Sequence, residues 1–163
     1  MEPHFYSTTD KDKKALYEEF LTQYAGLIEN ERDETSVMAN TAAALREAFG
    51  FFWVGFYRVT SAEELALGPF QGDVACYRIR KGRGVCGTAW AEGRTLVVAD
   101  VDAFPGHIAC SSLSRSEIVV PIIYNKEIKG VLDIDSDQPA DFDDTDREGL
   151  ENIMRLMAET LYS

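Results

Sequence analysis

The sequence lacks any long uninterrupted apolar run. Its apolar runs, such as residues 51–57 and 118–124 with seven residues each, are far shorter than the roughly 20 residues that a membrane-spanning helix needs. We therefore expect no membrane partner. Residues 1–7 also lack the charged and apolar regions of a signal peptide. From these two absences we expect a cytoplasmic protein.

Basic residues are scarce as well. Sixteen Lys and Arg stand against twenty-eight Asp and Glu, which gives a formal net charge of −12. Nucleic acids and anionic lipid surfaces would be repelled by such a chain. We therefore expect neither as a partner, while a zwitterionic or cationic small molecule meets no such barrier.

Cysteine is the third residue type in short supply. The chain has only Cys76, Cys86 and Cys110, an odd number at wide spacings, which excludes a framework of structural disulfides. His107 lies near Cys110, but the cysteines lack the short paired spacings of structural zinc sites. We predict no metal and no bound cofactor, and we expect the cysteines to be thiols or a redox set.

What the chain does contain is typical of one globular domain. It has 163 residues, of which 45% are hydrophobic and 27% charged, enough for a single core. We expect residues 1–12 to form a flexible tail and residues 13–163 to form the domain. The sequence leaves open whether two copies pair as a homodimer.

Helical periodicity is found at both ends of the chain. Apolar residues spaced by three or four predict a helix over residues 13–30, and a second helix, capped by Thr35 or Ser36, running to Phe49. A last helix follows Phe142, with acidic residues in its first turn. Its apolar stripe consists of Leu150, Ile153, Met154, Met157 and Leu161.

The middle of the chain is typical of strands. Residues 51–59 predict a strand, 61–67 a loop, 74–80 a return strand, 95–99 a short strand, and 118–124 with 128–135 a hairpin. A short helix is expected at about residues 85–92, after a basic loop whose glycines, Gly82 and Gly84, leave backbone amides open to an anion. The pattern predicts an α+β fold with a central antiparallel sheet of about five or six strands and the terminal helices packed on one side.

Residues 104–117 form a turn-rich loop that contains a cysteine. Pro105 and Gly106 indicate a turn, and four serines follow Cys110 within six residues. The segment directly precedes the core strand at Ile118, where a scaffold can position a reactive group. Cys110 is therefore a candidate nucleophile, but from this loop alone a small buried apolar residue is the favoured interpretation.

Five motifs lie between about residue 51 and the last helix, and they include two of the three cysteines: residues 53–57 (WVGFY), 82–89 (GRGVCGTA), 104–110 (FPGHIAC), 116–121 (SEIVVP) and 130–136 (GVLDIDS). Together they resemble one enzyme family, the free methionine-(R)-sulfoxide reductases, which are GAF-domain proteins. The resemblance extends to all three cysteines. It implies a single GAF-like domain that reduces free L-methionine (R)-S-oxide, with thioredoxin as the external reductant.

The resemblance also implies roles for individual residues. Cys110 matches the catalytic cysteine, and Cys86 and Cys76 match the residues that resolve or recycle it. Substrate-pocket positions match three acidic residues, Glu117, Asp133 and Asp135, and two aromatic residues, Trp53 and Tyr57. The sequence departs from the family at Ser111, where an aspartate is usual, which affects the charge beside Cys110.

The implied chemistry needs a thiolate and an acid. A thiolate attacks the electrophilic sulfur of a sulfoxide, provided that the leaving oxygen is protonated. Asp133 and Asp135 lie two apart on a predicted strand, so they share one face, and their repulsion favours the protonated form of one. The oxidised Cys110 would be a sulfenic acid that condenses with Cys86 or Cys76 to a disulfide.

Two other functions fit the same residues. A GAF domain without catalysis would bind a small molecule and act as a sensor, and a thiol redox switch would oxidise its cysteines without any substrate. Taken singly, the acidic residues also suit a solvated strand face, and Trp53 and Tyr57 suit an apolar core. The combination of motifs favours the enzyme.

Overall fold

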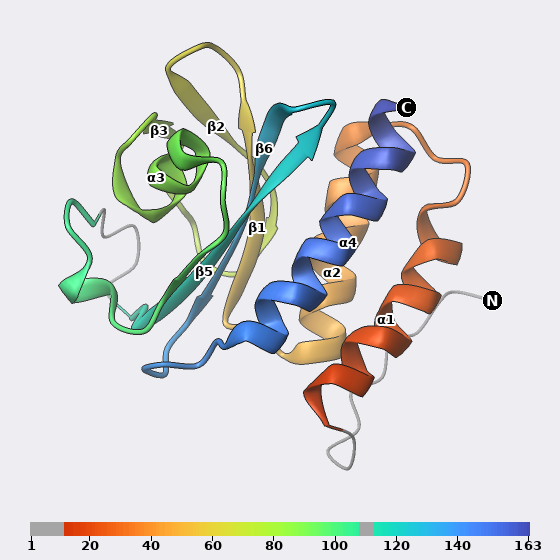
Figure 1. Cartoon of the computed structure of the whole chain (residues 1–163), viewed down its shortest axis with the longest axis horizontal. Coiled ribbons are helices and arrows are strands. Elements are labelled where there is room, and N and C mark those ends of the chain that lie inside the picture. Colours follow the sequence, from red (N-terminus) through yellow and green to blue (C-terminus); the bar gives the residue numbers. More distant parts are fainter. Residues whose placement is uncertain (1–11, 108–112) are drawn as a thin grey trace.

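A six-stranded antiparallel sheet divides the molecule into two unequal layers (Figure 1). The computed structural model describes residues 12–107 and 113–163. Three helices, α1 (Lys13–Ile28), α2 (Glu34–Phe49) and α4 (Asp144–Tyr162), cover one face of the sheet, and the short helix α3 (Gly84–Glu92) covers the other. The predicted α+β class, with the terminal helices on one side, is confirmed.

The strands follow a meander interrupted by α3. Their order across the sheet is β3-β2-β1-β6-β5-β4, and every neighbouring pair is antiparallel. The four long strands, β2, β1, β6 and β5, therefore lie between two short edge strands, β3 and β4. The strands are β1 (Trp53–Val59), β2 (Glu64–Gln71), β3 (Arg78–Arg80), β4 (Leu96–Val98), β5 (Ser116–Tyr124) and β6 (Glu127–Ser136), with a 3-10 turn, η1 (Val101–Ala103), before β5.

The three helices on the larger face begin at aspartates. Asp12 caps α1, and residues 1–11 of the predicted tail lie outside the described residues. Helix α2 is capped by Asp33, whose carboxylate accepts a hydrogen bond from the Ser36 amide at 2.8 Å, so the predicted cap at Thr35 or Ser36 was wrong by two or three positions. Asp143 caps α4 in a reciprocal capping box.

The second strand was the main error of the sequence prediction. Residues 64–71, half of them assigned to a loop, form β2 beside β1, and only Arg78–Arg80 of the predicted return strand is a strand. Gly68 and Pro69 argue against a strand in the sequence, but the register between β1 and β2 shifts between Gly55 and Tyr57. A bulge there accommodates the proline without a ladder hydrogen bond.

Each face of the sheet has its own apolar core. The helical side packs α1, α2 and α4 against alternate residues of β1, β5 and β6: Val54, Phe56, Ile118, Val120, Ile122, Leu132 and Ile134. The smaller core under α3 includes Tyr57, Val119 and Val131 from the intervening positions. The period of two along each strand thus separates the two cores.

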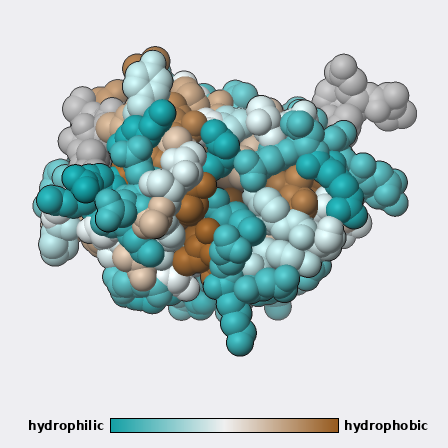
Figure 2. All heavy atoms as spheres, turned by 90° about the horizontal axis from the view of Figure 1, so that it is seen from above, coloured by the Kyte–Doolittle hydropathy of each residue, from teal (hydrophilic) through white to brown (hydrophobic). Residues whose placement is uncertain are grey.

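The outer surface agrees with the acidic composition. Seen from above, it is mostly hydrophilic, with apolar areas confined to small patches between polar groups (Figure 2). Within residues 12–107 and 113–163, no helix combines the length and apolar character that crossing a bilayer requires.

Candidate functional site

The register of the three central strands brings the predicted acidic residues together. Asp135 of β6 pairs with Glu117 of β5 on one side and with Trp53 of β1 on the other. Asp133 pairs with Val119 and Gly55 in the same way. Because alternate residues share a face, all three carboxyl groups project toward α3, as predicted for the two aspartates.

These side chains line a pocket between the sheet and α3. Six of the eight predicted site residues contribute to its wall: Trp53, Tyr57, Cys86, Glu117, Asp133 and Asp135. Cys76 does not, although Val74 and Ala75 beside it do. Cys110 lies outside the described residues. Phe52, Asp73, Arg83 and His107 also line the pocket, and none of them had been predicted as a substrate-pocket residue.

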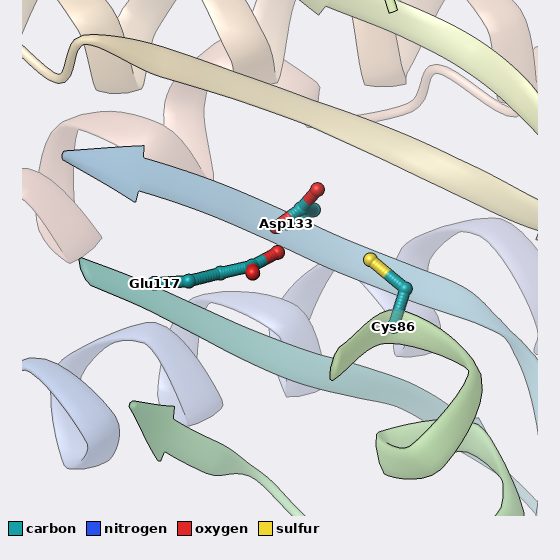
Figure 3. Close-up of side chains that lie close together, drawn as sticks. All are labelled: Cys86, Glu117 and Asp133. Carbon is teal, nitrogen blue, oxygen red and sulfur yellow. The ribbon is translucent and has the colours of Figure 1, made fainter. Parts of the chain in front are cut away.

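Helix α3 places a thiol, that of Cys86, beside two of the carboxyl groups. The ligand atoms of Cys86, Glu117 and Asp133 all lie within 4.8 Å of one another, and all three residues are buried (Figure 3). Gly87 lets α3 pack closely against the end of β3, because a Cβ there would lie 2.4 Å from the Arg80 carbonyl oxygen. The helix that carries Cys86 is therefore held on this face by close backbone packing.

Burial controls the protonation of this cluster. It raises the pKa of the Glu117 and Asp135 carboxyls well above their usual range, and the charge of Asp133 raises both further. The pKa of Asp133 is raised less, because hydrogen bonds from Glu117 and from the Cys86 thiol favour its ionised form. Burial thus favours the protonated forms of Glu117 and Asp135, and Asp133 is the most readily ionised of the three.

One oxygen of the Asp133 carboxyl group is available to a ligand. Among the described residues, Asp133 Oδ1 is buried and accepts no hydrogen bond. A buried acceptor left unpaired costs about 1–3 kcal/mol, and a donor from a bound molecule would remove this cost. Since the neighbouring groups are a thiol and carboxyls, the cluster is suited to a cation or a strong hydrogen-bond donor.

The aromatic wall has a structural role in addition to the predicted lining. Trp53 stacks on Tyr57, with ring centroids 6.4 Å apart. The Trp53 indole donates a hydrogen bond to the Asp73 carbonyl at 2.9 Å, and the Tyr57 hydroxyl donates one to the Cys76 carbonyl at 3.0 Å. Both rings therefore anchor the segment that carries Cys76.

The two described cysteines are in different states. Cys86 is a free, buried thiol, and burial together with the charge of Asp133 raises its pKa well above the ordinary value. Cys76 is half-buried and disulfide-bonded. The sequence could not separate these two residues as partners of Cys110, but the structure gives them distinct environments.

The start of α3 forms the opposite side of the pocket. Arg83 is the N-cap residue, its side chain makes no capping hydrogen bond, and Gly84 and Val85 of the first turn line the pocket with it. The glycine-flanked basic loop had indicated a place for an anion in the sequence, and it lies at this pocket. Acidic and basic walls therefore face a common space.

A curled antiparallel sheet with three helices on one face, and a small-molecule pocket under a short helix on the other, defines a GAF domain. The GAF domain family matches residues 31–161 of the chain. The chain belongs to this family and, within it, to the free methionine-R-sulfoxide reductases, as its similarity to the following proteins shows.

Two curated relatives and one solved structure are representative. The chain is 55% identical to GAF domain-containing protein A of Dictyostelium discoideum, over 89% of this chain and 92% of that protein. It is 41% identical to the free methionine-R-sulfoxide reductase of Escherichia coli, over 92% and 91%. The structure of free methionine-R-sulfoxide reductase from Neisseria meningitidis, in complex with its substrate, has a TM-score of 0.93 at 53% identity, covering 98% of this chain and 95% of that one.

Proposed function

We propose that the protein reduces free L-methionine (R)-S-oxide to L-methionine. The observation that carries this proposal is the pocket itself, in which three buried carboxyl groups with raised pKa values and an aromatic wall meet beneath α3. A chain of the same fold and 53% identity is a reductase that was solved with its substrate. The (R) stereochemistry rests on the names of such relatives.

A free amino acid fits the distribution of charge. We assign the α-ammonium group to Asp133, whose Oδ1 atom lacks a partner among the described residues. The α-carboxylate is assigned to Arg83 and the open amides at the start of α3. Trp53 and Tyr57 would contact the sulfur and its methyl group. A methionine within a peptide has neither terminal charge and would be excluded.

The oxygen must leave in protonated form. Glu117 and Asp135, whose pKa values are raised by burial, are the proposed donors. The Cys110 thiolate attacks the sulfoxide sulfur and takes over the oxygen, so that methionine leaves and Cys110 becomes a sulfenic acid. One proton is consumed with the thiolate, and the sulfoxide is reduced by two electrons.

We propose Cys76 as the residue that resolves the sulfenic acid. Its thiol would displace water from the Cys110 sulfenic acid to form a disulfide, which thioredoxin then reduces to two thiols. Cys86 is less suited because its buried thiol has a raised pKa, which reduces the thiolate that can attack. Such a cycle requires a reducing compartment, in keeping with the expected cytoplasmic location.

The decisive experiment offers the free (R) and (S) epimers separately, with thioredoxin, thioredoxin reductase and NADPH. Oxidation of NADPH with the (R) epimer alone is expected, and a methionine sulfoxide within a peptide should give none. Cys110→Ser should abolish turnover, whereas Cys76→Ser should still release one equivalent of methionine per chain. Tight binding of another small molecule, with no turnover of either epimer, would show that the protein is a sensor and not this enzyme.

A further inference from the structure

Two of the most exposed apolar side chains flank a redox cysteine. Among the described residues, Val74 and Tyr77 have the highest exposed fractions of any large hydrophobic residue, 88% and 77%. Both lie within two positions of Cys76, which is disulfide-bonded and half-buried. Scattered apolar residues on a surface need no explanation, but a pair on either side of a reactive sulfur does.

The exposure of these side chains is set by an anchored backbone. The carbonyls of Asp73 and Cys76 accept hydrogen bonds from Trp53 and Tyr57. The next carbonyl, that of Tyr77, accepts one from the Leu67 amide at 2.9 Å. The segment is thus held to the sheet through its main chain. These bonds fix the position of the main chain, and the side chains of Val74 and Tyr77 are left exposed on its outer side.

Positive charge adjoins this segment. Four cations, Arg78, Arg80, Lys81 and Arg83, fall within six residues of a chain whose net charge is −12. Arg78 lies 3.4 Å from Glu64 and Arg80 lies 3.8 Å from Glu63, in pairs whose side chains are 42–80% exposed. Exposed pairs of this kind are weak, so both arginines can turn to a partner with negative charge.

We propose that Val74, Tyr77, Arg78 and Arg80 form a docking surface for a protein thiol–disulfide reductase. The inference rests on the proposed function, because it assumes that the disulfide of Cys76 is formed during turnover. The partner is defined by chemistry: it must bring a thiol to this disulfide, cover two apolar side chains, and present acidic groups to the two arginines. The four residues are called the Cys76 surface below.

The reaction at this surface is a thiol–disulfide exchange. A thiolate of the reductase attacks one sulfur of the disulfide, forming a mixed disulfide and releasing the other sulfur as a thiolate. A second thiol of the reductase, once deprotonated, attacks the mixed disulfide and frees this chain. Two electrons pass to the enzyme, its two sulfurs end as thiols, and the reductase ends as a disulfide.

The test compares two reductants on the same variants. Tyr77→Ser removes an apolar contact, and Arg80→Glu reverses a charge; neither residue lines the pocket. With thioredoxin as reductant, we expect each variant to raise the KM for thioredoxin roughly tenfold, as truncation of an anchor residue typically does. With dithiothreitol, which needs no docking surface, turnover of the sulfoxide should stay within about twofold of the unmodified protein.

Matched controls come from the opposite edge of the sheet. Ile123→Ser in β5 and Arg155→Glu in α4 also remove an exposed apolar side chain and reverse an exposed charge. Neither should change the KM for thioredoxin. Raising the salt concentration should weaken the thioredoxin reaction of the unmodified protein more than that of Arg80→Glu, because it screens the same attraction.

The results separate this proposal from the proposed function. If the unmodified protein turns over the sulfoxide with neither reductant, the proposed function fails. If it turns over the sulfoxide, but Tyr77→Ser and Arg80→Glu leave the KM for thioredoxin unchanged, the Cys76 surface is not the docking site. An equal loss with both reductants would also overturn the proposal, since it would mean that the variants damage the enzyme and not the encounter.

Discussion

The two faces of the sheet are built from the same strands and serve different ends. On the helical face, β5 and β6 present an unbroken row of buried aliphatic residues to α1, α2 and α4. On the α3 face, the alternate positions of the same strands hold Val119 and Val131 in the smaller apolar core. The next positions on that face are the pocket residues Glu117, Asp133 and Asp135. Neighbouring residues of one strand therefore have different roles: one packs in the apolar core and the next lines the pocket. We expect substitutions on the helical face to act on stability and those on the α3 face to act on activity.

The largest expected effect is at Glu117. Glu117→Gln keeps the size of the side chain but removes a proposed proton donor, so the single-turnover rate with the (R) epimer should fall about 100- to 10,000-fold. The melting temperature should stay the same or rise, since a buried acid is replaced by a neutral amide. A quenched-flow assay of methionine measures the single-turnover rate, and differential scanning calorimetry measures the melting temperature. Full activity in this variant would remove Glu117 from the mechanism.

The opposite pattern is expected one strand away, at Leu132. This residue is fully buried on the helical face, and Leu132→Ala should lower the free energy of unfolding by about 2–5 kcal/mol, because it leaves a cavity. The activity per folded molecule should be retained at low temperature. Urea denaturation gives the stability. A variant that folds well but is inactive would break the division between the two faces.

The dependence of stability on pH should sharpen the contrast. The folded-state pKa values of Glu117 and Asp135 are raised by burial, so the folded protein retains protons that the unfolded chain releases above its ordinary carboxyl pKa. Their contribution is therefore fully favourable at low pH and is lost as pH rises toward the folded values. Each retained proton costs up to about 1.4 kcal/mol per pH unit.

Glu117→Gln provides the comparison for this pH effect. The variant should be more stable than the unmodified protein, and its advantage should be greater at pH 8 than at pH 5, by on the order of 1 kcal/mol or more. Urea midpoints at the two pH values give the answer. Leu132→Ala is the control, because its loss of stability should be nearly the same at both. An advantage that shrinks as pH rises would contradict the raised pKa.

The smallest effect is expected at Tyr57. Tyr57→Phe keeps the ring but removes the hydrogen bond to the Cys76 carbonyl, which should cost about 1 kcal/mol of stability. The proposed resolving step should slow, while the first release of methionine stays the same. Trapping of the sulfenic acid with dimedone during a single turnover checks this. Phe56→Leu, on the helical face of the same strand, should change stability alone.

Much of the fold could be predicted from the sequence because periodicity reports burial. The apolar stripes of α1 and α4 and the alternation of apolar residues in β5 and β6 indicate which side of each element is buried. The strand β2 was missed because Gly68 and Pro69 normally interrupt a ladder, and the bulge that accommodates them depends on β1. Asp33 was missed as a cap because it stands one residue ahead of the Glu-Thr-Ser run.

The candidate site was predictable in its members more than in its arrangement. The spacing of Asp133 and Asp135 shows that they share a face, but the pairing of Glu117 with Asp135 depends on a hairpin register that composition does not fix. The contact of Cys86 with Asp133 depends on where α3 packs on the sheet, and the close packing of Gly87 against the Arg80 carbonyl becomes visible only in the structure. Arg83 and His107 lie in loops, where sequence patterns do not predict which way a side chain points.

The central position of β5 and β6 has a consequence for motion. The proposed acids stand on strands whose amides should be among the last to exchange with deuterium, because exposing them requires opening the whole domain. The segment with Cys76 lies next to the edge strand β3 and is held by two side-chain hydrogen bonds, one backbone hydrogen bond and the disulfide of Cys76. Reduction of that disulfide removes one of these attachments, so a partner can act on the segment while the strands that carry the acids stay closed.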